Sequence, residues 1–326
     1  IGVTGVDTAA EVTLLGDVID GLSSTAVDQV SEVQALADAV QSVMDGAAGT
    51  ASKPTLAELQ ALGINNVTAD NLAAIQASIA ATADDGTGVD SASELQAIVD
   101  AVNTAITTIS TAAQNNSATA TTPTLADYAT AGVSNVDASN LAAVNDALNS
   151  AAVTGALTDT PAEIQSVVDG YRAILASADG TDGNGTNPTQ GQYAAIGVTG
   201  VDDTEEVKLL GDVIDGLSST AVNTISQLQY LASQVQAVMD MAAGTTSDLP
   251  NLDTLGVPLS NPSNNDGLAI LIGATADDGS GVDTVAKIQA LVDAQNAALN
   301  AISIAAENNN ATATSPSLAT YQAAGI

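Results

Sequence analysis

A short segment that starts at a proline and ends at a Gly-Val or Gly-Ile pair recurs along this 326-residue chain and constrains its fold most. Its clearest copy is Pro123–Val133, P-T-L-A-D-Y-A-T-A-G-V. Threonine can cap the first turn of a helix, apolar residues three apart share a face, and glycine can end the helix in the left-handed conformation. The segment therefore predicts a short helix with its own stop signal. Related segments start at Pro54, Pro188, Pro250 and Pro316.

The glycine of this stop signal gives the period of the sequence. It occurs at Gly2, Gly63, Gly132, Gly197, Gly256 and Gly325, with spacings of 61, 69, 65, 59 and 69 residues. A longer period covers three such units, because residues 1–50 align with residues 196–245 and 36 of the 50 positions are identical. We therefore expect five sequence repeats, A (1–63), B (64–132), C (133–197), A′ (198–256) and B′ (257–326).

The two ends of the sequence fall at the same point of the repeat. It starts with Ile1-Gly2-Val3 and finishes with Gly325-Ile326. From this we expect the chain to be a window on a longer array.

Apolar residues at spacings of three and four predict an all-α fold in which each repeat holds a short, a medium and a long helix. In repeat B, Thr68 is the expected cap of a helix that ends near Ile79, and a long helix is expected from about Ser91 to Gln114. Asp7 and Asp137 are the expected caps in repeats A and C. In repeat B′ prolines delay the second helix to about Asp266. The predicted architecture is a tandem array of three-helix bundle repeats.

Composition excludes several classes of function. Only 4 basic residues oppose 38 acidic ones, and the net charge of −34 excludes a nucleic-acid partner, which requires a basic face. The sequence has no run of 18 apolar residues, so no membrane span is expected. It has no Cys and no His, and its chemistry is spread over copies, so we expect no enzymatic activity. With no Phe or Trp, the cores must be built from Leu, Ile, Val and Ala.

Acidic turns are the candidate sites, and the ligand that they would take is calcium. Calcium binds six to eight oxygens from carboxylates and backbone carbonyls, and glycine lets the backbone present them. Plain turn formation is the alternative explanation of the same residues, with Asp90 and Asp283 as caps of the long helices. The candidate residues are Asp84, Asp85, Asp90, Asp179, Asp182, Asn184, Asp277, Asp278 and Asp283.

The tyrosine at the second apolar site of the short helix is expected to be a core anchor. It occurs as Tyr128, Tyr193 and Tyr321, and repeat B has Leu59 at this place. A separate set of polar residues is kept between the two most similar repeats. Asp17, Asp20 and the run Ser23-Ser24-Thr25 recur in repeat A′ as Asp212, Asp215 and Ser218-Ser219-Thr220. A repeated contact between repeats or chains explains this retention, and so does recent duplication.

Three motifs carry a resemblance to a known class of protein. They are T-L-A-D-Y-x-x-x-G-V at 124–133, D-A-S-N-L-A-A-V-N at 137–145 and E-I-Q-x-V-V-D at 163–169. The chain resembles the Ala/Thr/Asp-rich helical repeats of very large bacterial cell-surface adhesins. This resemblance implies an extracellular stalk, filament or surface layer that associates with neighbouring repeats or copies. The helix order is also similar to small three-helix modules that bind serum albumin. That similarity implies the alternative function, recognition of a host or neighbouring surface protein.

Overall fold

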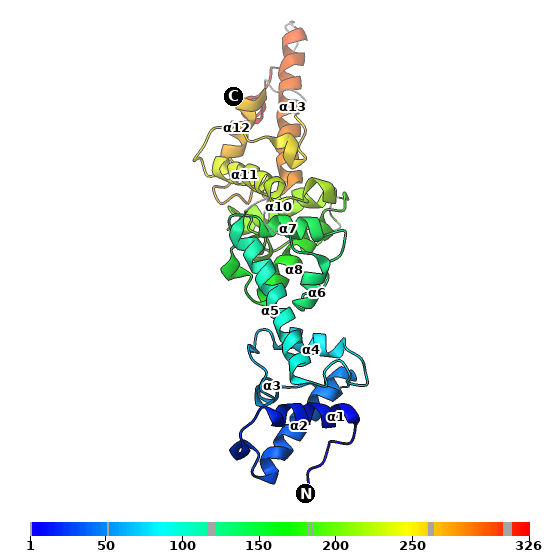
Figure 1. The fold of residues 1–326 in the computed structure, drawn as a ribbon. Helices are drawn as coiled ribbons and strands as arrows, with labels where there is room; N and C mark the ends of the chain where they lie inside the picture. The colour runs from blue at the N-terminus through cyan, green and yellow to red at the C-terminus, as the bar shows by residue number, and fades with distance from the viewer. Residues whose placement is uncertain are drawn as a thin grey trace. The chain divides into compact units, whose positions relative to one another are not determined.

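The computed structural model is all-helical, and it describes residues 2–50, 52–116, 122–181, 183, 185–259, 264–308 and 315–326 (Figure 1). The medium helices are α1 (Ala9–Asp20), α4 (Leu72–Ala80), α7 (Leu141–Leu148), α10 (Thr204–Asp215) and α12 (Asn265–Gly273). The long helices are α2 (Val30–Ala47), α5 (Ala92–Asn115), α8 (Pro161–Ser177), α11 (Ile225–Ala242) and α13 (Val285–Asn308). The short helices are α3 (Leu56–Ala61), α6 (Leu125–Thr130), α9 (Gln190–Ala195), the 3₁₀ turn η4 (Leu252–Leu255) and α14 (Leu318–Ala323). Three further 3₁₀ turns, which the sequence did not predict, are η1 (Ser24–Ala26), η2 (Gly155–Leu157) and η3 (Ser219–Ala221).

The short helices end as the sequence predicts. Gly63 follows α3 with a φ of 79°, and the glycines at the same place in the other copies also have positive φ. The residue after the glycine folds back, so that Ile64 N donates to Leu59 O at 3.1 Å. A Schellman-type closure of this kind satisfies carbonyls that would otherwise lack a partner. The same bond recurs as Val133 to Tyr128, Val198 to Tyr193, Val257 to Leu252 and Ile326 to Tyr321.

The predicted starts of the longer helices are only partly right. The helix α5 starts close to the predicted residue Ser91, which caps it by accepting a bond of 3.2 Å from Glu94 N. The cap of α1 is Thr8, and the prediction of Asp7 was wrong. Thr8 lies three residues before Glu11, and the two form a capping box in which the Glu11 carboxylate accepts the Thr8 amide.

The medium helices α4 and α7 begin with an extra turn. Thr68 and Asp137 lie four residues before the first helical residue and accept the amides of Leu72 and Leu141 through their backbone carbonyls. The side chain of Asp137 accepts from Ser139 N at 2.7 Å. These two residues therefore build the turn that leads into the helix, at the place where the sequence predicted the cap.

Four of the long helices pack against several neighbouring elements. The helix α2 contacts α1, α3 and α4, and α5 contacts α4, α6 and η2. In the same way, α11 contacts α10, η4 and α12, and α13 contacts α12 and α14. The buried side chains are mainly Leu, Ile, Val and Ala. Among the expected anchors, Tyr128, Tyr193 and Leu59 are fully buried, whereas Tyr321 is 38% exposed.

The chain divides into two compact units. The first comprises Ile1–Leu141 and Val153–Val168, and the second comprises Ala142–Ala152 and Asp169–Ile326. The boundary passes through repeat C, so that α7 and α8 each contribute residues to both units.

Candidate functional site

The first acidic turns use their carboxylates to shape the turn. Asp85 Oδ1 accepts bonds from Thr87 N at 3.1 Å and from Thr87 Oγ1 at 2.8 Å, and these bonds lower the pKa of Asp85. In the second copy, Asp278 accepts from Ser280 N at 3.0 Å, and its pKa is lowered by the bonds from Ser280. Asp84 and Asp277 are exposed.

Glycine and valine dock these turns onto the preceding repeat. Gly86 has a φ of 77°, and a Cβ added to it would collide with the Met44 side chain of α2. In the other copy, Gly279 approaches Met239 of α11 in the same way. Val89 and Val282 are fully buried. The pattern D-D-G-x-G-V-D is therefore explained by a turn that packs against a neighbouring long helix.

The last aspartate of the turn has different partners in the two copies. Asp283 is bonded by Lys287 Nζ at 2.5 Å and by Lys208 Nζ at 3.3 Å. Burial acts to raise the pKa of Asp283, but the two lysines bring it below its usual value.

Asp90 lies instead beside Glu94, and partial desolvation together with the Glu94 carboxyl raises the pKa of Asp90. The long helices are capped by Ser91 and Thr284, which accept from Glu94 N and Lys287 N. The alternative prediction that Asp90 and Asp283 are the caps was therefore wrong by one residue.

The third acidic loop lies near a buried carboxylate that the sequence did not single out. Asp179 Oδ1 accepts from Thr181 N at 2.8 Å, and Asp182 and Asn184 lie outside the described residues. The amide of Gly183 donates to Oδ2 of Asp215, a residue that is only 3% exposed. Asp215 Oδ1 and the buried Ser177 Oγ have no hydrogen-bond partner among the described residues.

Within the described part of the chain, one group of three carboxylates converges, and it contains none of the predicted calcium ligands. It consists of Asp202, Asp203 and Glu206 at the start of α10. Glu206 Oε2 accepts the amides of Asp202 and Asp203, and Asp203 caps the helix by accepting Glu206 N at 2.7 Å. A capping box thus accounts for the convergence.

A second set of contacts joins a medium helix to the long helix of the following repeat. Asp17 of α1 accepts the amide of Ala92, the first residue of α5, at 2.7 Å. Asp212 of α10 accepts the amide of Val285, the first residue of α13, at 2.7 Å. The first amides of a helix have no partner inside the helix, so an external carboxylate satisfies them and also interacts favourably with the helix dipole.

The same contact occurs between repeats C and A′. Asp146 of α7 accepts the amide of Ile225, the first residue of α11, at 2.6 Å. In all three cases the aspartate lies between two apolar residues, as in Leu15-x-Asp17-x-Ile19 and Val144-x-Asp146-x-Leu148.

Repeat B departs from this rule at both partners. It has Ala77 in the sequence Ile75-x-Ala77-x-Ile79, where repeats A, C and A′ have aspartate. The next long helix, α8, begins with Pro161, which has no amide hydrogen to donate. Aspartate is thus absent where the following helix has no amide to bind.

Glutamine holds the linker that follows four of the stop signals, a role that the sequence did not reveal. Gln96 of α5 accepts from Asn65 N at 2.8 Å and donates to Asn65 O at 3.2 Å. Gln34, Gln165 and Gln229 bind the backbone of Thr4, Ser134 and Thr199 in the same way. In repeat B′ the linker residue is Pro258, and Gln289 bonds Asp293 instead.

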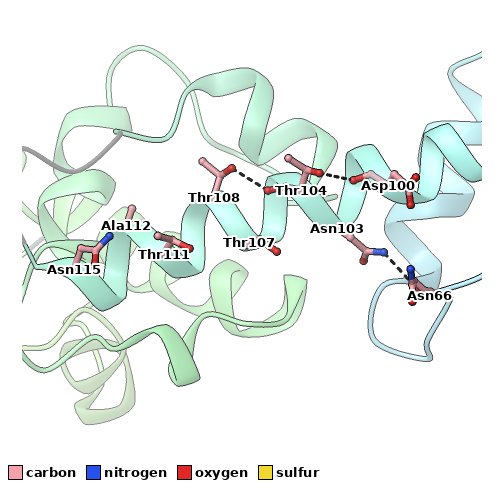
Figure 2. Close-up of a pocket in the computed structure, with 9 residues that line it drawn as sticks. All are labelled: Asn66, Asp100, Asn103, Thr104, Thr107, Thr108, Thr111, Ala112 and Asn115. Atoms are coloured by element: carbon pink, nitrogen blue, oxygen red, sulfur yellow. Dashed lines mark hydrogen bonds between the residues drawn. The ribbon is translucent and has the colours of Figure 1, made fainter.

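The helix α5 also lines an open groove of about 500 Å³ in the first unit (Figure 2). Two of its threonine hydroxyls are used on the helix itself, since Thr104 donates to Asp100 O and Thr108 to Thr104 O. The other lining residues are Asn66, Asn103, Thr107, Thr111, Ala112 and Asn115.

The threonine face of this groove is not kept in the second copy of the long helix. In α13 the positions of Thr104, Thr108 and Thr111 hold Ala297, Ala301 and Ile304. A binding function shared by the repeats would keep such a face. The junction aspartates are kept instead.

Searches against protein-family models, curated proteins and solved structures found no match to this chain. Among the residues that the structure describes, no helix has both the length and the apolar content that crossing a membrane requires.

Proposed function

We propose that this chain is a tandem array of three-helix repeats and forms a structural region, a stalk, filament or layer, of a large extracellular protein on a bacterial surface. The observation that carries the proposal is the bond from a medium-helix aspartate to the first amide of the next long helix. It occurs at Asp17, Asp146 and Asp212. A contact that is copied at three of the four junctions between repeats favours a structural role, because it fixes successive repeats to one another in the same way.

The retained surface of repeats A and A′ supports the same function. In repeat A′, Asp212 binds Val285, Asp215 accepts from Gly183, and Ser218 forms an isolated β-bridge with Asp179. These partners all belong to neighbouring repeats. The net charge of −34 adds repulsion between chains and keeps an apolar-rich array from collapsing onto other copies.

The test is small-angle scattering with light scattering on the wild-type chain and on a variant with Asp17→Ala and Asp212→Ala. The account predicts an elongated particle of defined length that becomes flexible in the variant. A compact particle with identical scattering in both proteins would contradict a stalk. It would favour the alternative function, recognition of a host or neighbouring surface protein by one face of a repeat.

Calcium binding at the third acidic loop is a second proposed property, and the buried Asp215 favours it. A buried carboxylate oxygen without a partner is costly, and in the described part of the chain no lysine or arginine bonds Asp215 Oδ1. A cation held by Asp215 Oδ1 and Ser177 Oγ, with further oxygens from residues 179–181 and 183, would neutralise the carboxylate and stiffen this segment.

Calorimetric titration with calcium, on the wild-type chain and on Asp215→Asn, tests this proposal. We expect saturable binding that the substitution abolishes, and an Asp20→Asn control that binds normally. Equal heats for the wild-type chain and Asp215→Asn would exclude this site.

A further inference from the structure

Repeats A and A′ present the same helical face in two different states of burial. Leu210, Ile214 and Val222 of repeat A′ are fully buried. The identical residues Leu15, Ile19 and Val27 of repeat A are partly exposed. The polar residue of this face follows the same trend, since Asp215 is buried and Asp20 is exposed. Because the residues are identical, their surroundings cause the difference.

Repeat C covers this face in repeat A′. The Tyr171 hydroxyl donates to Val222 O at 3.2 Å, and the Asn187 side chain packs so closely on Gly211 that a Cβ there would overlap it. Asp146 accepts the amide of Ile225 at 2.6 Å. Repeat C therefore supplies the Tyr171 donor, the Asp146 acceptor and the Asn187 packing contact, in addition to the Gly183 amide that donates to Asp215.

Repeat A carries the counterpart of each of these groups. The carbonyl of Val27 corresponds to Val222, Gly16 to Gly211, and the first amide of α2, at Val30, to Ile225. Gly16 has no atom within 4 Å of an added Cβ, and Val30 is 50% exposed. We define the A face as Leu15, Gly16, Ile19, Asp20, Val27 and Val30.

We propose that the A face is a docking surface for a three-helix repeat of the C type. The inference rests on the proposed tandem arrangement and names the partner that fits this surface. A C-type repeat supplies a medium-helix aspartate for the Val30 amide and a tyrosine hydroxyl for the Val27 carbonyl. A B-type repeat does not fit, because it has Ala77 or Ile270 in place of the aspartate and would leave the Val30 amide unsatisfied.

The junction residues thus encode the order of the repeats. A repeat of type A or C has the aspartate. It precedes a long helix whose first residue has an amide hydrogen to donate, as at Ala92, Ile225 and Val285. A B-type repeat, without aspartate, precedes a long helix that starts with Pro161. This rule excludes repeat B′ as the partner of the A face of a second copy, because its medium helix α12 has Ile270, which is 58% exposed, in place of the aspartate.

The test extends the full chain at its N-terminus with a second copy of residues 133–195, so that the natural connection between repeats C and A′ is reproduced before residue 1. Amide hydrogen exchange is measured at Val30. We expect exchange to slow on the order of tenfold or more, to the rate of Ile225, because docking protects the amide. The matched control is the same extension with Asp146→Ala and Tyr171→Phe in the added copy, which should leave Val30 fast.

A second variant keeps the proposal open to refutation if the added copy does not fold. In the unextended chain, Asp146→Ala with Tyr171→Phe should raise the exchange of Ile225 to that of Val30. Unchanged exchange at Ile225 in this double variant would contradict the proposed docking surface. Fast exchange at Val30 in the extended chain, with the added copy folded, would contradict it as well. An array that still scatters as an elongated particle in that case would leave the structural function standing.

Discussion

The carboxylate of Asp212 lies 2.7 Å from the backbone nitrogen of Val285, a residue 73 positions further along the chain. The bond links the medium helix of one repeat to the first residue of the long helix of the next. A bond of this kind ties the first turn of the second helix to the preceding repeat. The stability of repeat B′ should therefore depend on a residue of repeat A′.

Asp212→Ala should destabilise the second compact unit by about 1–2 kcal/mol, as expected for the loss of a charged acceptor at a helix N-terminus. Urea unfolding followed by circular dichroism measures this change. Asp212→Asn, which keeps an acceptor oxygen, should recover most of the loss. The exposed Asp240→Ala is the matched control and should change the free energy of unfolding by less than about 0.5 kcal/mol. Equal effects of Asp212→Ala and Asp240→Ala would contradict a role for the bond.

Gly16 and Gly211 occupy the same position of the segment L-L-G-D-V-I-D, which is identical in α1 and α10, and should respond to alanine with opposite signs. Gly16 lies in open surroundings, so Gly16→Ala should stabilise α1 by about 0.5–1 kcal/mol through higher helix propensity. An added Cβ at Gly211 would lie 2.7 Å from Asn187 Cβ, so Gly211→Ala should destabilise by about 1–3 kcal/mol. Thermal unfolding of the two single variants is the measurement. If both substitutions stabilise the protein, the close packing of Asn187 against Gly211 does not contribute to stability.

The capping box of α10 should be less stable at neutral pH than that of α1. Burial raises the pKa of Glu206, amide bonds from Asp202 and Asp203 oppose this, and the Asp203 carboxylate adds to the rise. In repeat A the cap is the neutral Thr8, and although burial acts to raise the pKa of Glu11, the amides of Thr8 and Asp7 bring it below its usual value. A raised carboxyl pKa means that stability falls as pH rises from the unfolded-state pKa through the folded-state pKa.

Asp203→Thr should therefore raise the free energy of unfolding at pH 7 relative to the wild-type chain, because it removes the charge beside Glu206. At pH 3 the repulsion between the two carboxyl groups is weaker, and the substitution should change the free energy of unfolding little. Thr8→Asp should have the opposite effect in repeat A. Urea unfolding at the two pH values gives both results. An Asp203→Thr effect that is the same at pH 3 and pH 7 would exclude the charge between Asp203 and Glu206 as its cause.

Much of the local structure follows from the sequence because its signals are local. The stop at Gly63 and Ile64 and the start of α5 near Ser91 each depend on residues within one or two turns. The cap of α1 was misassigned by one residue because Asp7 and Thr8 are both good caps, and only the partner Glu11 decides between them.

The candidate sites were harder to predict because their partners are distant. Nothing near Asp17 indicates that it binds an amide 75 residues away. The joint occurrence of Ala77 and Pro161 does indicate the contact, because both the acceptor and the donor are missing at this junction. It can be recognised only when the position that faces the start of the next long helix is known. The two lysines that bond Asp283 have no counterpart beside Asp90, so the two copies of the turn differ in a way that the shared motif conceals.

The glutamine that holds each linker offers a comparison within one protein. Gln229 bonds both the amide and the carbonyl of Thr199, at 3.0 and 2.9 Å, whereas Gln289 bonds the side chain of Asp293. Gln229→Ala should cost about 1 kcal/mol of unfolding free energy or slightly more, and Gln289→Ala less than about 0.5 kcal/mol. Denaturant unfolding of the two variants measures the difference. Equal costs would indicate that the linker is held by other contacts.

The most direct test of the central claim is amide hydrogen exchange at the first residues of the long helices, measured by NMR on the wild-type chain. First-turn amides lack a partner within the helix and normally exchange fast. The account predicts slow exchange at Ala92, Ile225 and Val285, whose amides are bound by aspartates of the preceding repeats, and fast exchange at Val30. Fast exchange at all four residues would contradict the claim that these aspartates join successive repeats.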